Sequence, residues 1–151
     1  MGAFAHRSLR VYAATLDLYE DALRVTRGSV LTAQSLEGQL LRAIASVALN
    51  IAEGAAEFSP GEKVRFYRIA RRSAAEAGAG FDLLARQGKL TLREADAGNR
   101  KLEAIAAMLT SMIHQARQAS TLGPAVRSGP APRPTRSINQ KPAPETIPEQ
   151  P

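Results

Sequence analysis

LEGQLLRAIASVALNIAEGAAE, residues 36 to 57, is an uninterrupted helical pattern with apolar side chains over about half of the helix circumference. At about 3.6 residues per turn, one broad face collects Leu36, Leu40, Leu41, Ile44, Ala45, Val47, Ala48, Ile51, Ala52 and Ala55. A helix on the outside of a monomer has a narrower apolar stripe. The sequence therefore predicts that this helix packs against more than one neighbour, within the chain or across a subunit boundary.

The opposite side of this helix carries a row of polar side chains. The row consists of Arg42, Ser46, Asn50 and Glu53, each three or four residues after the previous one. Asparagine has a poor propensity for mid-helix positions, so Asn50 is expected to have specific partners, and Glu76 is a candidate partner for Arg42. The row is either a binding surface or a structural feature that fixes the register of neighbouring helices or subunits. We favour the structural interpretation.

Two further amphipathic helices are predicted, one near the N-terminus and one after residue 90. The first carries apolar residues spaced by three and four and ends near Gly28; its stripe is Leu9, Tyr12, Leu16, Tyr19 and Leu23. The last begins at Thr91, with Glu94 as the partner in a capping box. Its apolar positions are Leu102, Ile105, Leu109, Met112 and Ala116.

The helix between them is expected from residue 60 to 87. Ser59, Pro60 and Glu62 supply an N-cap hydroxyl, a proline at the first position and a capping-box carboxylate, and Gly88 supplies a left-handed stop. The predicted inner face is Phe66, Ile69, Ala70, Ser73, Ala77, Phe81 and Leu84. Gly78 and Gly80 lower helix propensity, which indicates either close approach of another helix or a local weakness.

Four helices with short connections predict an all-α protein, an antiparallel up-down four-helix bundle in residues 1–120. Residues 121–151 contain eight of the nine prolines and almost no large apolar side chains. Such a segment buries too little surface to offset the entropy of ordering the chain, so it is expected to be a disordered tail. The tail is either passive, which we favour, or an extended partner-binding segment.

The central helix resembles a known family. Asn50, Ile51, Ala52, Glu53 and Gly54 are its signature, and weaker similarity covers residues 8 to 118. The chain resembles the four-helix bundle proteins first known from intervening sequences in large-subunit rRNA genes. It also looks like a related branch, the accessory proteins of diversity-generating retroelements. That branch implies a homo-oligomer, specifically a pentamer, that binds RNA and a reverse transcriptase.

Composition and missing motifs exclude several classes. The chain has no cysteine, and its first residues lack the apolar stretch of a secretion signal, so a cytoplasmic protein is expected. No apolar run approaches the roughly 20 residues that span a bilayer, so no membrane partner is expected. His6 and His114 have no glutamate at metal-site spacing, and no nucleophile motif or glycine-rich phosphate loop occurs. We therefore expect no enzyme, no catalytic residue, no metal and no cofactor.

A basic stripe is the clearest functional signal. The chain carries 20 Lys and Arg against 14 Asp and Glu, a net charge of +6. Four arginines near the start of the third helix lie on the side opposite its apolar face, and Lys63 is nearby at the helix start; the arginines are Arg65, Arg68, Arg71 and Arg72. Such a stripe is either a solvated helix face or a site for phosphate backbones, which bind with little sequence specificity. Tyr67 is the only aromatic residue beside it, so sequence-specific reading of single strands is not indicated.

Two classes of function remain open. The first is a non-enzymatic bundle that oligomerises and binds RNA or DNA backbones, with a reverse transcriptase as a partner that the resemblance implies. The second is a structural or protein-binding oligomer, in which the broad apolar face is an interface and the arginines keep the surface hydrated. Salt-dependent RNA binding distinguishes them, because only the first class predicts it.

Overall fold

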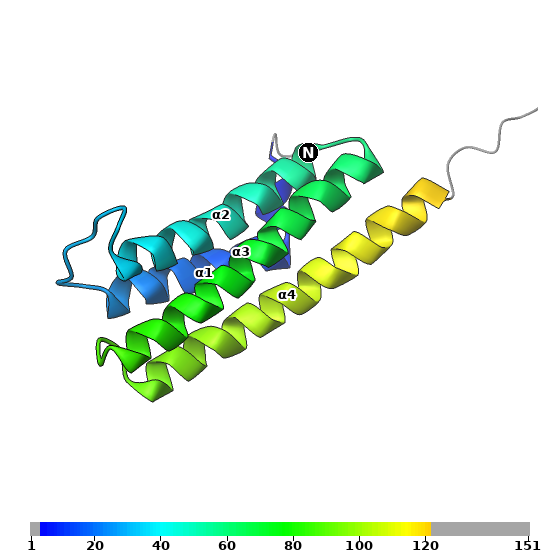
Figure 1. Cartoon of the computed structure of the whole chain (residues 1–151). Coiled ribbons are helices and arrows are strands. Elements are labelled where there is room, and N and C mark those ends of the chain that lie inside the picture. The colour runs from blue at the N-terminus through cyan, green and yellow to red at the C-terminus, as the bar shows by residue number, and fades with distance from the viewer. Residues whose placement is uncertain (1–3, 122–151) are drawn as a thin grey trace, which may run out of the picture.

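A computed structural model describes residues 4 to 121 and contains four α-helices and a short 3-10 helix (Figure 1). Their bounds are η1 (Ala5–Ser8), α1 (Arg10–Val25), α2 (Leu36–Ala56), α3 (Pro60–Arg86) and α4 (Leu92–Thr121). No strand occurs in this part of the chain. The predicted all-α class is confirmed. The predicted disordered tail, residues 121–151, lies almost wholly outside the described residues.

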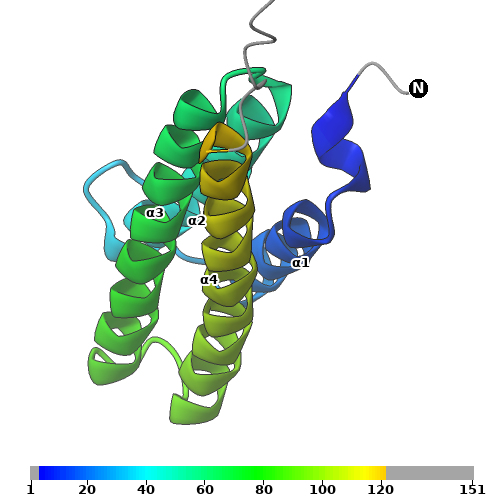
Figure 2. The same ribbon diagram turned by 90° about the vertical axis from the view of Figure 1, so that its right-hand side faces the viewer.

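The helices form an antiparallel up-down bundle, as the short connections predict. α1 and α3 each pack directly against α2 and α4, whereas no Cα atoms of the diagonal pairs, α1 with α3 and α2 with α4, lie within 8 Å of each other. Figure 1 shows α2, α3 and α4 running in alternating directions, and Figure 2 shows the shorter α1 on the opposite side of the bundle from α3. α1 has 16 residues and α4 has 30. The bundle therefore has unequal sides, and α1 covers only part of its neighbours.

The core draws on every helix. Its largest fully buried side chains are Leu18, Leu40, Ile44, Val47, Ile51, Leu84, Ile105 and Leu109. Four of these come from α2, whose broad apolar face contacts both α1 and α3. This confirms that α2 packs against more than one neighbour within the chain. Close packing also explains Gly80, where an added Cβ would lie 3.3 Å from the Leu40 side chain.

Caps and turns fall largely where the sequence places them. Ser35 and Ser59 accept hydrogen bonds from the third residue beyond them, and Thr91 and Glu94 form a reciprocal capping box. Gly28 and Gly88 have φ of 88° and 69°, the left-handed conformation that favours glycine. One prediction is wrong: the Glu62 carboxylate does not complete the box at Ser59, because it accepts a hydrogen bond from Arg65 at 2.8 Å.

The predicted inner face of α1 is wrong by about one residue. The buried residues are Val11, Thr15, Leu18 and Ala22, whereas Leu16 and Leu23 are each 42% exposed. Thr15 can be buried because its hydroxyl donates to the Val11 carbonyl at 2.7 Å, which satisfies the polar group inside the helix. The leucine and tyrosine stripe is thereby left at the edge of the bundle.

The buried face of α3 differs from the predicted inner face in its first aromatic residue. Tyr67 is 5% exposed, whereas Phe66 is only partly buried. Gly54 on α2 makes room for the Tyr67 ring, because a Cβ at Gly54 would lie 2.5 Å from Tyr67 Cε1. Burial raises the pKa of the Tyr67 phenol. The glycine of the signature at residues 50–54 therefore has a packing role.

A polar contact joins the first turn of α2 to the α3–α4 turn at one end of the bundle. Glu37, at the start of α2, is buried and accepts a hydrogen bond from Lys89 of the α3–α4 turn at 2.6 Å. The hydrogen bond from Lys89 holds the pKa of Glu37 below its usual value. Because Lys89 remains half exposed, this pair lies between a surface and a buried ion pair in strength.

Candidate nucleic-acid interface

The basic stripe lies on the first three turns of α3. Ser59 and Pro60 fix the start of this helix. Its buried side chains, among them Tyr67, Ala70 and Ala74, face the core. Residues on the opposite side must then face solvent. Arg65, Arg68 and Arg72 are all exposed there, within about two turns. The sequence also predicts these three arginines on the outer side of the helix, and their binding to nucleic acid stays a prediction.

The three outer arginines form the walls of a shallow hollow. Its volume is about 420 Å³, and it is lined by Gly61, Val64, Arg65, Arg68, Ile69 and Arg72. Within residues 4–121, neither Arg68 nor Arg72 has a carboxylate within ion-pair distance, so both charges are available to a ligand. Arg65 donates from Nε to Glu62 at 2.8 Å, which holds its guanidinium in place and partly offsets its charge.

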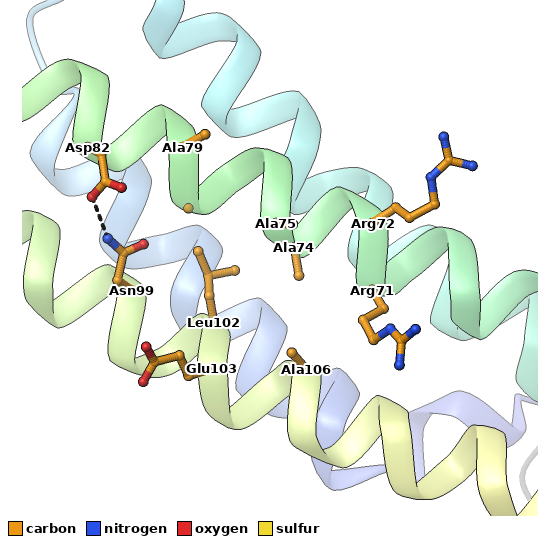
Figure 3. A pocket seen from close by; sticks show the side chains of 11 residues that line it. Arg71, Arg72, Ala74, Ala75, Ala79, Asp82, Asn99, Leu102, Glu103 and Ala106 are labelled. Carbon is orange, nitrogen blue, oxygen red and sulfur yellow. Dashed lines mark hydrogen bonds between the residues drawn. The ribbon is translucent and has the colours of Figure 1, made fainter.

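The other two basic residues of the predicted site are engaged elsewhere. Arg71 points toward α4 and donates to the Thr110 hydroxyl at 3.3 Å, while Arg72 points away from α4 (Figure 3). Lys63 donates from Nζ to the Gly54 carbonyl at 3.3 Å, near the C-terminal end of α2. A cation there also compensates the partial negative charge of that helix end. Only Arg65, Arg68 and Arg72 therefore share the outer surface.

A second hollow runs between α3 and α4 (Figure 3). Its volume is about 610 Å³, and its apolar lining comes from both helices: Ala74, Ala75, Gly78, Ala79, Leu102 and Ala106. Arg71 lies toward one end and Asp82 at the other, where the Asp82 carboxylate accepts a hydrogen bond from Asn99 at 2.7 Å. Asp82 and Glu103 make that end unfavourable for phosphate. The outer surface of α3 is the better candidate interface.

The polar row on α2 is divided among separate contacts. Ser46 and Ser73 share a hydrogen bond of 2.9 Å that links α2 to α3, and Asn50 donates to the Ser46 carbonyl at 2.8 Å. Arg42 donates to the Ala33 carbonyl at 3.1 Å and so anchors the α1–α2 connection. The suggested Arg42 and Glu76 pair is wrong for the described chain, because Glu76 is exposed and forms no ion pair.

These contacts fit the structural interpretation for Arg42, Ser46 and Asn50. Glu53 and Glu76 are exposed, and their carboxylates have no hydrogen-bond partner among residues 4–121. Whether the row crosses a subunit boundary stays a prediction. The partners of Arg42 and Ser46 lie in other segments, so helical spacing alone could not identify them.

The aromatic residues near the stripe differ from the prediction. Tyr67 belongs to the core, so it is unavailable to a ligand. Phe58, in the α2–α3 connection, is 98% exposed, and the Arg65 guanidinium lies 4.3 Å from the centre of the Phe66 ring. Sequence reasoning missed this pair of aromatics. The signal was present, because Phe58 directly precedes the Ser59 cap and so had to lie in a turn.

A second exposed surface is apolar. Asp21 pairs with Lys101 of α4, so the opposite edge of α1, with Leu16 and Leu23, faces away from α4. Leu49, on the outer side of the neighbouring α2, is 63% exposed. Apolar side chains mark a contact surface between proteins when they gather in one patch, and these three leucines are the candidates for such a contact. This surface is the best candidate for assembly.

The remaining candidate functional features are metal sites, membrane-spanning helices and His114. Within residues 4–121, no group of three or more histidine, aspartate or glutamate side chains is arranged to hold a metal ion. The helices in that range are also too short or too polar to cross a bilayer. His114 lies on the surface of α4 and contacts Gln118 at 3.0 Å.

Comparison with known proteins identifies relatives by sequence and by fold. Residues 7–111 match the family model described as 23S rRNA-intervening sequence protein. A crystal structure of a protein of unknown function from the S23 ribosomal protein family of Bacteroides thetaiotaomicron has a similar fold, with a TM-score of 0.62 and 23% identity. The alignment covers 68% of this chain and 97% of that one. No curated protein matches the chain.

Proposed function

Because the chain belongs to the family of 23S rRNA-intervening sequence proteins, we propose that it is a non-enzymatic bundle that binds nucleic-acid backbones as a homo-oligomer. The observation that carries the proposal is the outer surface of α3, where Arg65, Arg68 and Arg72 are exposed together. The family name associates its members with rRNA genes, which makes RNA the first ligand to test. The proposal assigns no catalytic step, metal or cofactor to the bundle, and it places the protein in the cytoplasm.

Charge explains how this surface would bind. Arginine side chains that neutralise phosphates release counterions from the nucleic acid, and this release supplies most of the affinity of non-specific complexes. Val64 and Ile69 line the same hollow, so the arginine stems have apolar surface to rest on while their charged ends remain in water. Phosphate contacts carry no sequence information, so low sequence specificity is expected.

The assembly part of the proposal is supported by the apolar edge of α1 and α2. Leu16, Leu23 and Leu49 are exposed in the single chain, and a second copy that covers them would remove this apolar surface from water. The likeness to retroelement accessory proteins adds a pentamer and a reverse transcriptase partner. These two additions rest on that likeness alone.

A charge-removal experiment tests the nucleic-acid part. Replacing Arg65, Arg68 and Arg72 with glutamine removes three charges, while the buried face of α3 is unchanged and glutamine remains a good helix former. We expect weaker binding to unrelated RNA sequences, with unchanged helix content and mass. A matched control replaces the exposed arginines of α4, Arg93→Gln, Arg100→Gln and Arg117→Gln, which changes net charge equally at other positions.

The control separates local contact from overall charge. If both triple variants lose affinity equally, the binding depends on net charge, and the α3 surface is not the site. If neither variant loses affinity, the arginines of α3 only solvate the helix.

A purely protein-binding scaffold is the alternative function, and the exposed leucines of α1 and α2 are the observation that favours it. This alternative predicts a stable oligomer with no salt-dependent affinity for RNA or DNA. Light scattering together with a binding titration of the parent protein distinguishes the two functions.

A further inference from the structure

An exposed aromatic side chain directly precedes the basic surface. Phe58 lies in the connection between Ala56 of α2 and Pro60 of α3, and it is 98% exposed. A phenylalanine that stays in water contributes no burial to folding, because it is as hydrated in the folded chain as in the unfolded one. The stability of the bundle therefore gives no reason for an aromatic residue at this position.

Besides the Phe58 ring, a second planar group, the Arg65 guanidinium, lies about one and a half turns into α3. The Arg65 guanidinium covers one face of the Phe66 ring at 4.3 Å and is held at its edge by Glu62 at 2.8 Å. The Arg65 side chain is still 56% exposed, so more than half of its surface remains open to a ligand. Planar guanidinium groups and aromatic rings are the surfaces on which proteins stack unpaired bases.

Phe58 precedes the first residue of α3 by two positions, and Arg65, Arg68 and Arg72 follow along the outer side of this helix. Pro60 and Arg65 are about 8 Å apart along the axis of α3, and Arg72 lies about 10 Å further on. One short strand could therefore contact Phe58, Arg65 and the two unpaired arginines in order. A duplex could use the arginines but not the stacking groups, because its base faces are already covered by neighbouring bases.

We propose that this surface selects unpaired nucleotides, with bases stacked on Phe58 and on the Arg65 plane and phosphates bound by Arg68 and Arg72. The inference rests on the proposed nucleic-acid function and names its ligand class. Stacking accepts any base, so the surface prefers single strands over duplexes without reading their sequence.

The test compares a single strand with a duplex. The probes are an oligo(U) strand of about 20 nucleotides and an RNA duplex of about the same length, at one fixed salt concentration. Phe58→Ala is expected to weaken oligo(U) binding by about five- to 150-fold, the loss for one base–aromatic stack, and to leave duplex binding nearly unchanged. Phe58→Leu is expected to lose as much as Phe58→Ala, whereas Phe58→Trp retains the affinity.

A matched control and a mass measurement complete the design. Leu92 is 73% exposed at the opposite end of the bundle, and Leu92→Ala should change binding to neither probe. If Phe58→Leu binds oligo(U) like the parent, the contact is merely apolar and the inference is overturned. The same holds if Phe58→Ala lowers the assembled mass together with the affinity, because Phe58 is then an assembly contact.

The two proposals fail in different ways. A parent protein that binds neither probe overturns the nucleic-acid function and this inference with it. A parent that binds both probes equally, with Phe58→Ala affecting neither, overturns only the preference for unpaired nucleotides.

Discussion

Replacing Gly54 with alanine is expected to destabilise the bundle even though alanine is the better helix former. An added Cβ would lie 2.5 Å from Tyr67 Cε1 and 2.8 Å from Cδ1, well inside van der Waals contact with a buried ring. Overpacking of this kind costs about 1 to 3 kcal/mol. The gain in helix propensity is about 1 kcal/mol. The packing cost should therefore win, with a net loss of up to about 2 kcal/mol.

Gly61→Ala is the matched control for this substitution. Gly61 lies in the first turn of α3, is exposed, and an added Cβ would approach only the Ser59 hydroxyl at 3.7 Å. This variant should be stabilised by up to about 1 kcal/mol. Urea denaturation followed by circular dichroism measures both changes. Equal stabilisation of the two variants would refute the packing role of Gly54.

Three further predictions concern a charge pair, the polar row and assembly. Glu37→Gln should destabilise the bundle by about 1 to 2 kcal/mol at pH 7, and the difference should disappear as the pH falls through the lowered pKa of Glu37. The stability that the Glu37 carboxylate adds is fully present above its unfolded pKa and is lost as the pH falls through its lower pKa in the folded protein. A pH series of melting curves would show a constant difference if the Lys89 contact contributed nothing. Asn50→Leu should lower stability or assembled mass more than RNA affinity, and an RNA-binding defect in a variant that melts and assembles like the parent would contradict the structural role. Replacing Leu16 and Leu23 with serine should lower the mass measured by light scattering, and a monomeric parent would contradict the assembly surface.

A helix and its buried face were predictable where the sequence contains a single apolar pattern at helical spacing. The apolar arc of α2 is so wide that both of its neighbours contact it, and Thr91 with Glu94 fixes the start of α4. α1 was ambiguous, because two stripes at helical spacing compete. The larger side chains of Leu16 and Leu23 favoured the wrong one, since a sequence does not show that Thr15 satisfies its own hydroxyl within the helix.

The candidate site was predictable only as far as one helix determines it. Arg65, Arg68 and Arg72 face outward because Tyr67 and Ala70, on the opposite side of the helix, face the core. Arg71 and Lys63 belong to the same run of sequence, but their partners, Thr110 and Gly54, come from other helices. Such contacts depend on how the helices pack and cannot be obtained from spacing along α3.

The salt dependence of RNA binding tests the central claim most directly. For the parent protein, log affinity should fall linearly with log salt concentration, because phosphate contacts release counterions. The slope of the Arg65, Arg68 and Arg72 glutamine variant should be smaller by about two to three units on a duplex, whereas the α4 control variant should keep the slope of the parent. A variant with the affinity and the slope of the parent would contradict the account, because the arginines of α3 would then contact no phosphate.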